Sequence, residues 1–352
     1  MTLQLLWFCV LAALWSGYFV LEGFDFGVGM LLPFVGRGER DRAVMLESIG
    51  PVWDGNEVWL VVAGAATFVA FPVWYATMFS GFYLALLLIL VFLIFRAVGF
   101  EWRTKSDHAR WRTFWTTTTI AASFAVPFLW GVALASLLGG VPLDSNGDYA
   151  GNLVDLFSLY SVTAGIAVVL LFAFHGATFL TLRTSGALCE RVARAARLLA
   201  VPAAVVVTGF GVWTVAIAVD RNDKDVFPPI LPAVLAVAAL VGAALAAYRR
   251  RSGWSFAATA AAAILIVATL FTSLYPRVIV SRPNFGNSLS VSDAASSHYA
   301  LVAISIVALI LMPVVVLYQL WTYYVFRARL TGEEPEPPLK LVSGRAGGTP
   351  AG

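Results

Sequence analysis

Two pairs of acidic residues lie in an otherwise apolar sequence. The segment GYFVLEGFDFGVGM places Glu22 three residues before Asp25, and the segment GPVWDGNEVWLV places Asp54 three residues before Glu57. Residues three apart lie on one face of a helix, so the two carboxyl groups of each pair point the same way. A carboxylate inside a membrane costs about 2.5 to 3.5 kcal/mol on insertion scales unless it is paired, protonated or hydrated. These acids therefore need a compensating partner or a function.

Two interpretations of these acids are open. In the first interpretation they are structural. The helix dipole stabilises the negative charge of Asp54 near the start of a helix, and other carboxylates pair with arginines such as Arg96. In the second they form a hydrated file of titratable groups that carries protons inward from the cytoplasm, because a carboxyl group can take up a proton and pass it on. The candidate residues of this proton path are Asp25, Asp54, Glu22 and Glu57, and Arg96 is their candidate charge partner.

Glycines flank the first acidic pair. Gly23 and Gly27 stand four residues apart in a GxxxG pattern. Small residues at this spacing let the backbone of a neighbouring membrane helix approach closely. The pattern predicts a tightly packed helix crossing beside Glu22 and Asp25.

The composition identifies the elements that carry these acids. Of the 352 residues 60% are hydrophobic and 12% are charged, whereas an ordinary soluble domain holds about 25% charged residues. A bilayer core of about 30 Å needs about 20 mostly apolar residues per helix, and the chain supplies nine such runs. A transmembrane β-barrel would show short alternating segments instead. We predict an all-α integral membrane protein with nine transmembrane helices at residues 4–32, 51–71, 74–98, 116–139, 156–181, 198–219, 228–248, 254–275 and 298–325.

The basic residues predict the orientation of these helices. Cytoplasmic loops of membrane proteins retain lysine and arginine. All but four of the 23 basic residues fall in the tail or in the connections that follow the first, third, fifth and seventh predicted helices. The four on the other side are Arg221, Lys224, Arg277 and Arg282. This alternation predicts an N-terminus outside the membrane and a C-terminus in the cytoplasm.

The chain is predicted to form a single domain. Residues 1–330 form one polytopic membrane domain, because the connections between the helices are too short to hold a core of their own. Residues 331–352 are polar and rich in proline and glycine, so they are predicted to form a disordered cytoplasmic tail. The first helix is predicted to be retained, because MTLQLLWFCV lacks the basic region of a cleaved signal peptide.

The histidines argue against a haem or metal centre in this chain. The sequence contains three, His108, His175 and His298, and only His175 falls inside a predicted helix. A lone membrane histidine more often makes a hydrogen bond to a neighbouring helix than it ligates iron. Phosphate-binding glycine loops and CxxC pairs are also absent from the sequence. We therefore predict that the chain alone binds no cofactor and no metal.

Several long segments resemble a known family. They are EGFDFGVGML in the first predicted helix, GPVWDGNEVWLVVAGAATFVAFPVWYATMFSGFYLALLLIL across the second and third, FRAVGFEWR after the third, and ATFLTLRTSG after His175. Together they are similar to subunit II of the cytochrome bd quinol oxidases. The resemblance is strongest over residues 17–185, with a fainter match in YPRVIVSRPNFGNSLSVSDAASS before the last helix.

The resemblance implies a fold and an activity. The fold is two four-helix bundles, helices 1 to 4 and 5 to 8, with the ninth helix at the periphery. Oxidases of this family oxidise a membrane quinol, reduce dioxygen to water and take up protons from the cytoplasmic side. Subunit I carries two haem b, one haem d and the quinol-oxidising loop, whereas subunit II lacks haem and in some members holds a structural quinone.

The implied role of this chain is that of a haem-free subunit II in the bacterial cytoplasmic membrane. It would support subunit I and provide a path for cytoplasmic protons, with Asp25 and Asp54 corresponding to acidic residues that deliver protons toward the haems. The resemblance does not identify the quinol or any small accessory subunits.

The alternative function is a proton-coupled secondary transporter, which would also explain buried acids in a polytopic protein. Such transporters usually show broken helices at corresponding positions of two inverted repeats, and the sequence shows no convincing pair. A third interpretation is a purely structural subunit that supports assembly, in which the acids only pair with nearby residues. Purification distinguishes these functions, because an oxidase subunit copurifies with a haem-bearing partner and a transporter is colourless.

Overall fold

The structure is a computed structural model that describes residues 2–330. The predicted disordered tail, 331–352, lies outside the described residues. The helices are α1 (Leu3–Val35), α2 (Glu39–Ile49), α3 (Trp53–Ala70), α4 (Pro72–Gly81), α5 (Tyr83–Trp102), α6 (Ala109–Gly139), α7 (Leu159–Arg183), α8 (Gly186–Asn222), α9 (Phe227–Tyr248), α10 (Ser252–Leu274), α11 (Val291–Ala294) and α12 (His298–Val325). The short elements are the 3-10 turns Leu153–Leu156 and Phe285–Asn287 and the antiparallel strands β1 (Arg277–Ile279) and β2 (Leu289–Ser290).

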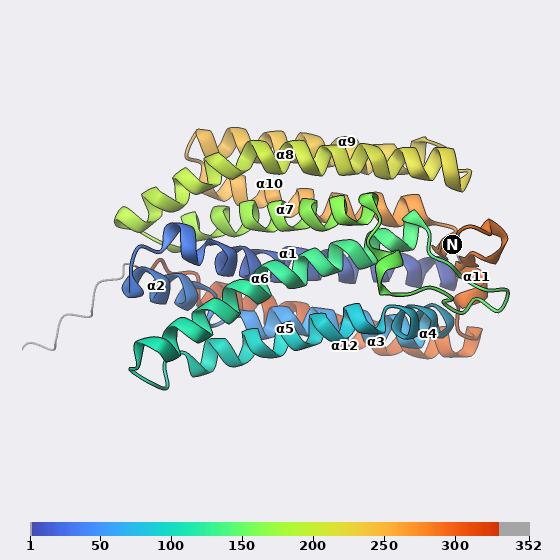
Figure 1. The fold of residues 1–352 in the computed structure, drawn as a ribbon, viewed down its shortest axis with the longest axis horizontal. Coiled ribbons are helices and arrows are strands. Elements are labelled where there is room, and N and C mark those ends of the chain that lie inside the picture. The colour runs from blue at the N-terminus through green and yellow to red at the C-terminus, as the bar shows by residue number, and fades with distance from the viewer. Residues whose placement is uncertain (1, 331–352) are drawn as a thin grey trace, which may run out of the picture.

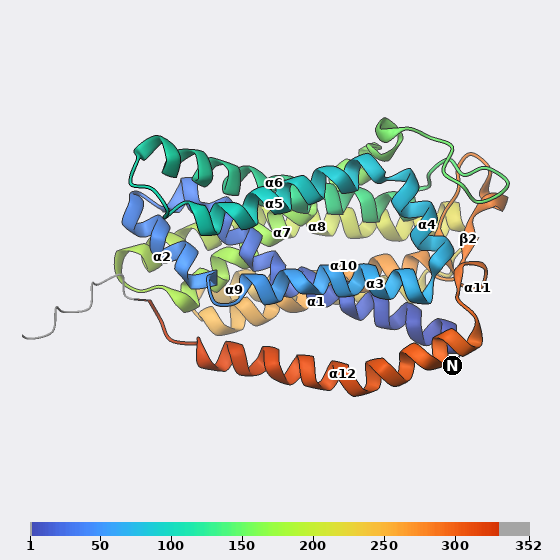
Figure 2. The same cartoon turned by 90° about the horizontal axis from the view of Figure 1, so that it is seen from below.

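The long helices lie side by side along an elongated molecule (Figure 1). One end, here called the α2 end, holds α2 and the turns that join α5 to α6, α7 to α8 and α9 to α10. The opposite end, the α11 end, holds the N-terminus, α4, the two strands and α11 (Figure 2). The all-helical architecture agrees with the sequence prediction.

Eight of the described helices are long and apolar enough to cross a membrane: α1, α5, α6, α7, α8, α9, α10 and α12. The second predicted span corresponds to α3, which has 18 residues and is not among the eight. Its first turns contain Asp54, Asn56 and Glu57, and these polar residues lower its mean hydropathy. The polar residues that mark α3 as a candidate site therefore also make it less apolar than the other eight helices.

A proline divides the segment that follows α3. Helix α3 ends at Ala70, and Pro72 occupies the first turn of α4, where its missing N–H and fixed φ angle are tolerated. Helix α4 ends at Gly81, and α5 begins at Tyr83. The apolar run predicted as one helix over residues 74–98 is thus two helices, and α4 lies at the α11 end (Figure 2).

Two helices extend beyond their predicted apolar runs toward the α2 end. Helix α6 begins at Ala109 rather than residue 116, and α8 begins at Gly186 rather than residue 198. The added turns contain arginine. The predicted spans are continuous apolar runs, which end where charged residues begin, so these turns are predicted to be loops. Helix α2 lies in a predicted connection for the same reason.

Helices α1 and α7 form the centre of the packing. Helix α7 packs against α1, α6, α8 and α10, and α1 also packs against α3 and α6. Helices α8, α9 and α10 pack on one another beside α7, whereas α5 packs against α6. The sequence predicts a close helix neighbour for Gly23 and Gly27, and that neighbour is α7. A Cβ atom on Gly27 would lie 2.0 Å from the carbonyl oxygen of Phe172 and 2.7 Å from the Cα of Gly176.

Helix α12 lies at the edge of the molecule, against α3 and α1 (Figure 2). Leu301 is its one fully buried residue. Near its start, the indole nitrogen of Trp7 donates a hydrogen bond to the Ser305 hydroxyl at 2.9 Å. Beyond its end, the Leu330 N–H donates to the carbonyl of Arg183 at 2.7 Å. Polar contacts therefore add to the apolar packing by which Leu301, Ala308 and Met312 attach α12 to the other helices.

Candidate functional site

Three helices bring four charged residues together inside the molecule. Glu22 and Asp25 come from α1, Glu57 from α3 and Arg96 from α5. A guanidinium nitrogen of Arg96 contacts the Glu22 carboxylate, and both side chains are 0% exposed. The same nitrogen lies 4.0 Å from Glu57 Oε2, and the Glu57 side chain is 22% exposed. We call these four residues the acidic cluster.

Aromatic rings enclose the guanidinium of Arg96. Its Cζ atom lies 4.3 Å from the ring centroid of Phe26 and 5.0 Å from that of Phe100. A guanidinium over an aromatic face is attracted by the negative potential of the ring. The Nε and Nη2 atoms of Arg96 are buried and make no hydrogen bond within the described part of the chain. Arg96 is therefore held by charge and ring contacts more than by hydrogen bonds.

The acidic cluster has more carboxyl groups than cations. Two carboxyl groups, those of Glu22 and Glu57, lie within 4.0 Å of the single guanidinium of Arg96, and the third, Asp25, accepts a hydrogen bond from Asn56 instead. Glu22 Oε2 and Asp25 Oδ1 are buried and make no hydrogen bond among the described residues. Burying an unpaired negative charge costs far more free energy than burying a neutral carboxyl group. The cluster can therefore hold a proton on one of its carboxyl groups.

Asn56 connects the acidic cluster to α12. Its Nδ2 atom donates to Asp25 Oδ2 at 2.7 Å and to the carbonyl of Leu21 at 3.2 Å. Its Oδ1 atom accepts hydrogen bonds from Gln319 Nε2 and from the Tyr323 hydroxyl, each at 2.8 Å. Sequence reasoning did not select these three residues as site candidates. Gln319 could have been selected from the sequence, because it is the one amide side chain in the apolar run of α12.

Asp54 lies apart from the buried acids. It is in the first turn of α3, at the α2 end, and it is exposed. None of the hydrogen bonds or ion pairs found for residues 2–330 includes its carboxylate. The residue at the N-cap of α3 is Val52, and no side chain caps the helix. The structure therefore places Asp54 one helical turn before Glu57, on the exposed side of the acidic cluster.

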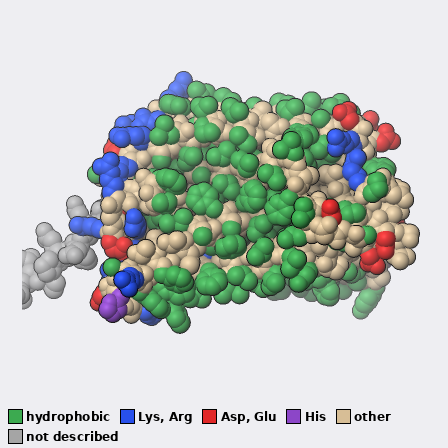
Figure 3. All heavy atoms as spheres, in the orientation of Figure 1, with side chains coloured by type: hydrophobic (Ala, Val, Ile, Leu, Met, Phe, Trp, Pro, Cys, Tyr) green, Lys and Arg blue, Asp and Glu red, His purple; other side chains and the backbone are tan. Residues whose placement is uncertain are grey.

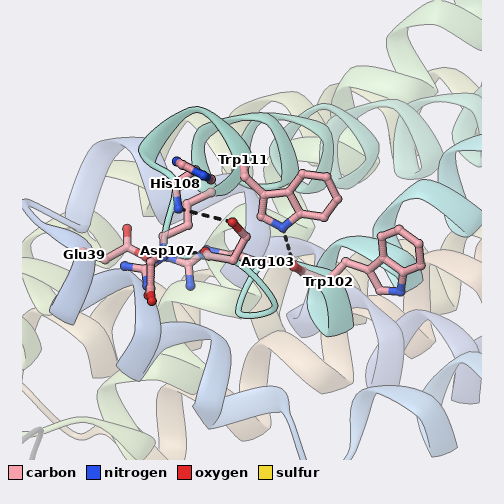
Figure 4. A network of polar contacts seen from close by, with 8 residues as sticks. Glu39, Trp102, Arg103, Asp107, His108 and Trp111 are labelled. Atoms are coloured by element: carbon pink, nitrogen blue, oxygen red, sulfur yellow. Dashed lines mark hydrogen bonds and ion pairs between the residues drawn. The ribbon is translucent and has the colours of Figure 1, made fainter.

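A network of polar contacts fixes the α2 end near this site (Figure 4). Arg103, which follows α5, contacts Glu39 at the start of α2 and donates to the Thr116 hydroxyl of α6 at 3.0 Å. In the same turn the indole nitrogen of Trp111 donates to the carbonyl of Trp102 at 2.7 Å. Because α2 leads directly into α3, these contacts restrain the turn of α3 that carries Asp54.

The surroundings of the three histidines differ. Both ring nitrogens of His175 have partners: Nδ1 lies 2.7 Å from the Thr259 hydroxyl, and Nε2 lies 3.0 Å from the carbonyl of Val20. The ring stacks on Phe256 with centroids 4.8 Å apart. His108 and His298 are exposed. Across residues 2–330 no group of three His, Cys, Asp or Glu side chains could hold a metal ion.

Comparison with known proteins identifies the family. The family model described as cytochrome bd terminal oxidase subunit II matches residues 3–326. Subunit 2 of the cytochrome bd ubiquinol oxidase of Bacillus subtilis is 40% identical, over 94% of this chain and 97% of the relative. Subunit 2 of the cytochrome bd-I ubiquinol oxidase of Escherichia coli K12 is 34% identical, over 95% of this chain and 97% of the relative.

A solved structure shares the fold. The bd oxidase structure from Geobacillus thermodenitrificans matches with a TM-score of 0.65 at 20% identity, over 93% of this chain and 99% of that chain. The apolar helices agree with the membrane location of such oxidases. The chain therefore belongs to the cytochrome bd terminal oxidase subunit II family and is a multi-pass subunit of an oxidoreductase of the bacterial inner membrane.

Proposed function

We propose that this chain is a haem-free subunit II that provides the cytoplasmic proton-uptake path of a quinol oxidase. The named relatives are ubiquinol oxidase subunits, which supports a quinol as electron donor. Subunit I would be the partner and would carry the two haem b and the haem d that reduce dioxygen to water. The observation that carries the proposal is the acidic cluster together with Asp54: exposed Asp54 lies one helical turn from partly exposed Glu57, and the other carboxyl groups of the cluster are buried inside an apolar protein.

The proposed membrane arrangement has nine crossings. In it α3 crosses with the eight apolar helices, one bundle contains α1, α3, α5 and α6, the other contains α7 to α10, and α12 is peripheral. The lysine and arginine side chains gather mainly at the α2 end (Figure 3), which supports a cytoplasmic location for that end because positive charge is retained there. Asp54 would then face the cytoplasm.

The proposed path follows the burial of the carboxyl groups. A proton enters at exposed Asp54 and passes one helical turn along α3 to Glu57, which is partly exposed. From Glu57 it moves to Glu22 on the far side of the shared Arg96 nitrogen, which contacts Glu22 and lies 4.0 Å from Glu57. From Glu22 it moves to Asp25, three residues further along α1. Each transfer moves a proton between carboxyl oxygens directly or through one water molecule. The positive charge of Arg96 limits the negative charge that remains after each transfer.

Replacement of Asp54 by Asn tests this path. The amide keeps the shape of the side chain but carries no transferable proton, so quinol-driven oxygen consumption should fall by about tenfold or more. The deficit should grow toward alkaline pH, where protons are scarce. Haem content and assembly should be unchanged, because Asp54 is exposed and no residue in the described chain depends on it for a hydrogen bond.

Two control variants accompany this measurement. Asp54→Glu retains a titratable group and should keep more activity than the Asn variant. Asp107→Asn removes another exposed carboxylate at the α2 end, whose partner is Arg112 rather than the acidic cluster, and should have wild-type turnover. Wild-type turnover of a fully assembled Asp54→Asn enzyme at every pH would remove Asp54 from the path.

The haem-free assignment predicts an unchanged spectrum for His175→Gln. Glutamine retains a hydrogen-bonding amide for Thr259 and Val20, whose contacts occupy both ring nitrogens in the structure. Absorption spectra of the purified complex should show all haem signals at wild-type intensity relative to protein. Selective loss of one haem b signal from an assembled complex would show instead that this chain contributes a ligand.

A further inference from the structure

The last helix carries two side chains that face the acidic cluster. Gln319 and Tyr323 are four residues apart on α12, so they lie on one face of the helix. Both are only partly exposed, whereas their neighbours Tyr318 and Tyr324 are 62% and 64% exposed. Gly55 of α3 leaves room for this approach, since a Cβ atom there would lie 3.3 Å from Gln319 Oε1.

Asn56 stands between α12 and Asp25 and uses its full hydrogen-bonding capacity. An amide side chain has two donor positions and two acceptor positions. The donors face α1, where both partners are acceptors: the Leu21 carbonyl and the Asp25 carboxylate. The acceptor atom faces α12, where Gln319 and Tyr323 both donate. Asn56 is 0% exposed, so no contact with bulk water replaces these bonds.

This arrangement determines which end of the amide faces Asp25. Rotation of the Asn56 amide by half a turn would direct its oxygen at two acceptors on α1, and Gln319 and Tyr323 would both have to reorient in order to accept from its NH₂ group. Unpaired or opposed polar groups in a buried site cost more free energy than a hydrogen bond contributes. The acceptors on α1 therefore determine which end of the amide faces Asp25, and the two α12 side chains stabilise that orientation by donating to the Asn56 oxygen.

We propose that Gln319 and Tyr323 are positioning residues for proton transfer, acting through Asn56 to hold the hydrogen bond on Asp25. The proposal rests on the proposed proton-uptake function for its effect on turnover, but not for its effect on the Asp25 carboxyl group. Helix α12 has one fully buried residue, and these two hydrogen bonds link the acidic cluster to that peripheral helix. The last helix is thereby part of the proton-path machinery.

The test uses the purified complex with subunit I and compares Tyr323→Phe, Gln319→Leu and the double variant. Tyr318→Phe is the matched control, because it removes an exposed hydroxyl from the adjacent turn of the same helix. Redox-induced infrared difference spectra report the Asp25 carboxyl group, whose bands are those lost in Asp25→Asn. The bands should shift in both single variants and further in the double variant, and should be unchanged in Tyr318→Phe.

Turnover provides the second measurement. Each single variant should lower kcat about threefold, the factor that corresponds to one hydrogen bond between membrane helices, with KM for quinol unchanged. In an Asp25→Asn background Tyr323→Phe should have no further effect, because the residue acts only through Asp25. A structural role of α12 alone would lower the yield of complex without shifting the Asp25 bands.

The outcomes separate this inference from the proposed function. Unshifted Asp25 bands in an assembled Tyr323→Phe complex would overturn the positioning role, and this variant removes a single oxygen atom and should fold even if the double variant does not. Shifted bands together with wild-type turnover of Asp25→Asn would retain the positioning role and reject Asp25 as part of the proton path.

Discussion

Replacing Arg96 by Met should leave little assembled complex in the membrane. Arg96 is the cation that contacts Glu22 in the interior, and both side chains are 0% exposed. Removing one partner of a buried ion pair costs about 3 to 5 kcal/mol, because the other charge remains without compensation. Membranes that express the variant should contain little spectroscopically detectable oxidase, and the remainder should dissociate at lower temperature.

A double variant separates charge imbalance from lost packing. Glu22→Gln combined with Arg96→Met removes both charges and should recover a large part of the stability, since apolar replacements of a whole buried pair are often neutral. Arg112→Met breaks an exposed pair with Asp107 and should have little effect. Wild-type amounts of a stable Arg96→Met complex would show that Glu22 needs no cation.

Replacing Gly27 by Val should separate α1 from α7 and prevent stable assembly. The first atom of any side chain at this position would lie 2.0 Å from the carbonyl oxygen of Phe172, a backbone atom that cannot rotate away. Overpacking of a well-packed core typically costs about 1 to 3 kcal/mol, and a clash between two helix backbones should reach the upper part of that range. Thermal dissociation of the detergent-solubilised complex measures the loss.

Gly209→Ala in α8 is the matched control for this variant. It also replaces a glycine inside a long helix, but no other group lies within 4 Å of the position of its Cβ atom. Alanine has the higher helix propensity, so this change should be neutral or stabilising. Equal stability of the Gly27→Val and Gly209→Ala complexes would contradict the close approach of α1 and α7.

The sequence was sufficient to predict the all-helical membrane class and to select the acidic residues. A pair such as Glu22 and Asp25 stands out because an apolar run has few polar residues, and their spacing places them on one helix face. The order of contacts inside the cluster was not predictable in the same way. Whether Arg96 contacts Glu22 or Asp54 depends on the relative depth of α1, α3 and α5, which hydropathy does not specify.

Other features escaped prediction for identifiable physical reasons. The first turns of α8 contain Arg191 and Arg194, and charge content marks such turns as loop although arginine is a good helix former outside the lipid. The break at Pro72 was missed because the apolar run continues through it. The link from Asn56 to Gln319 joins residues 263 positions apart, and only tertiary packing brings them together.

The distance along the chain between Glu22 and Arg96 sets an order of events during synthesis. Arg96 lies 74 residues after Glu22, and a ribosome adds about 5 to 20 residues per second. Glu22 therefore exists for roughly 4 to 15 seconds before its cationic partner has been made. During that interval α1 holds two carboxyl groups in an apolar helix, where each costs less free energy with a proton than without one. The ion pair can therefore form only after α3 and most of α5 have been made, although one of its two residues lies in the first helix.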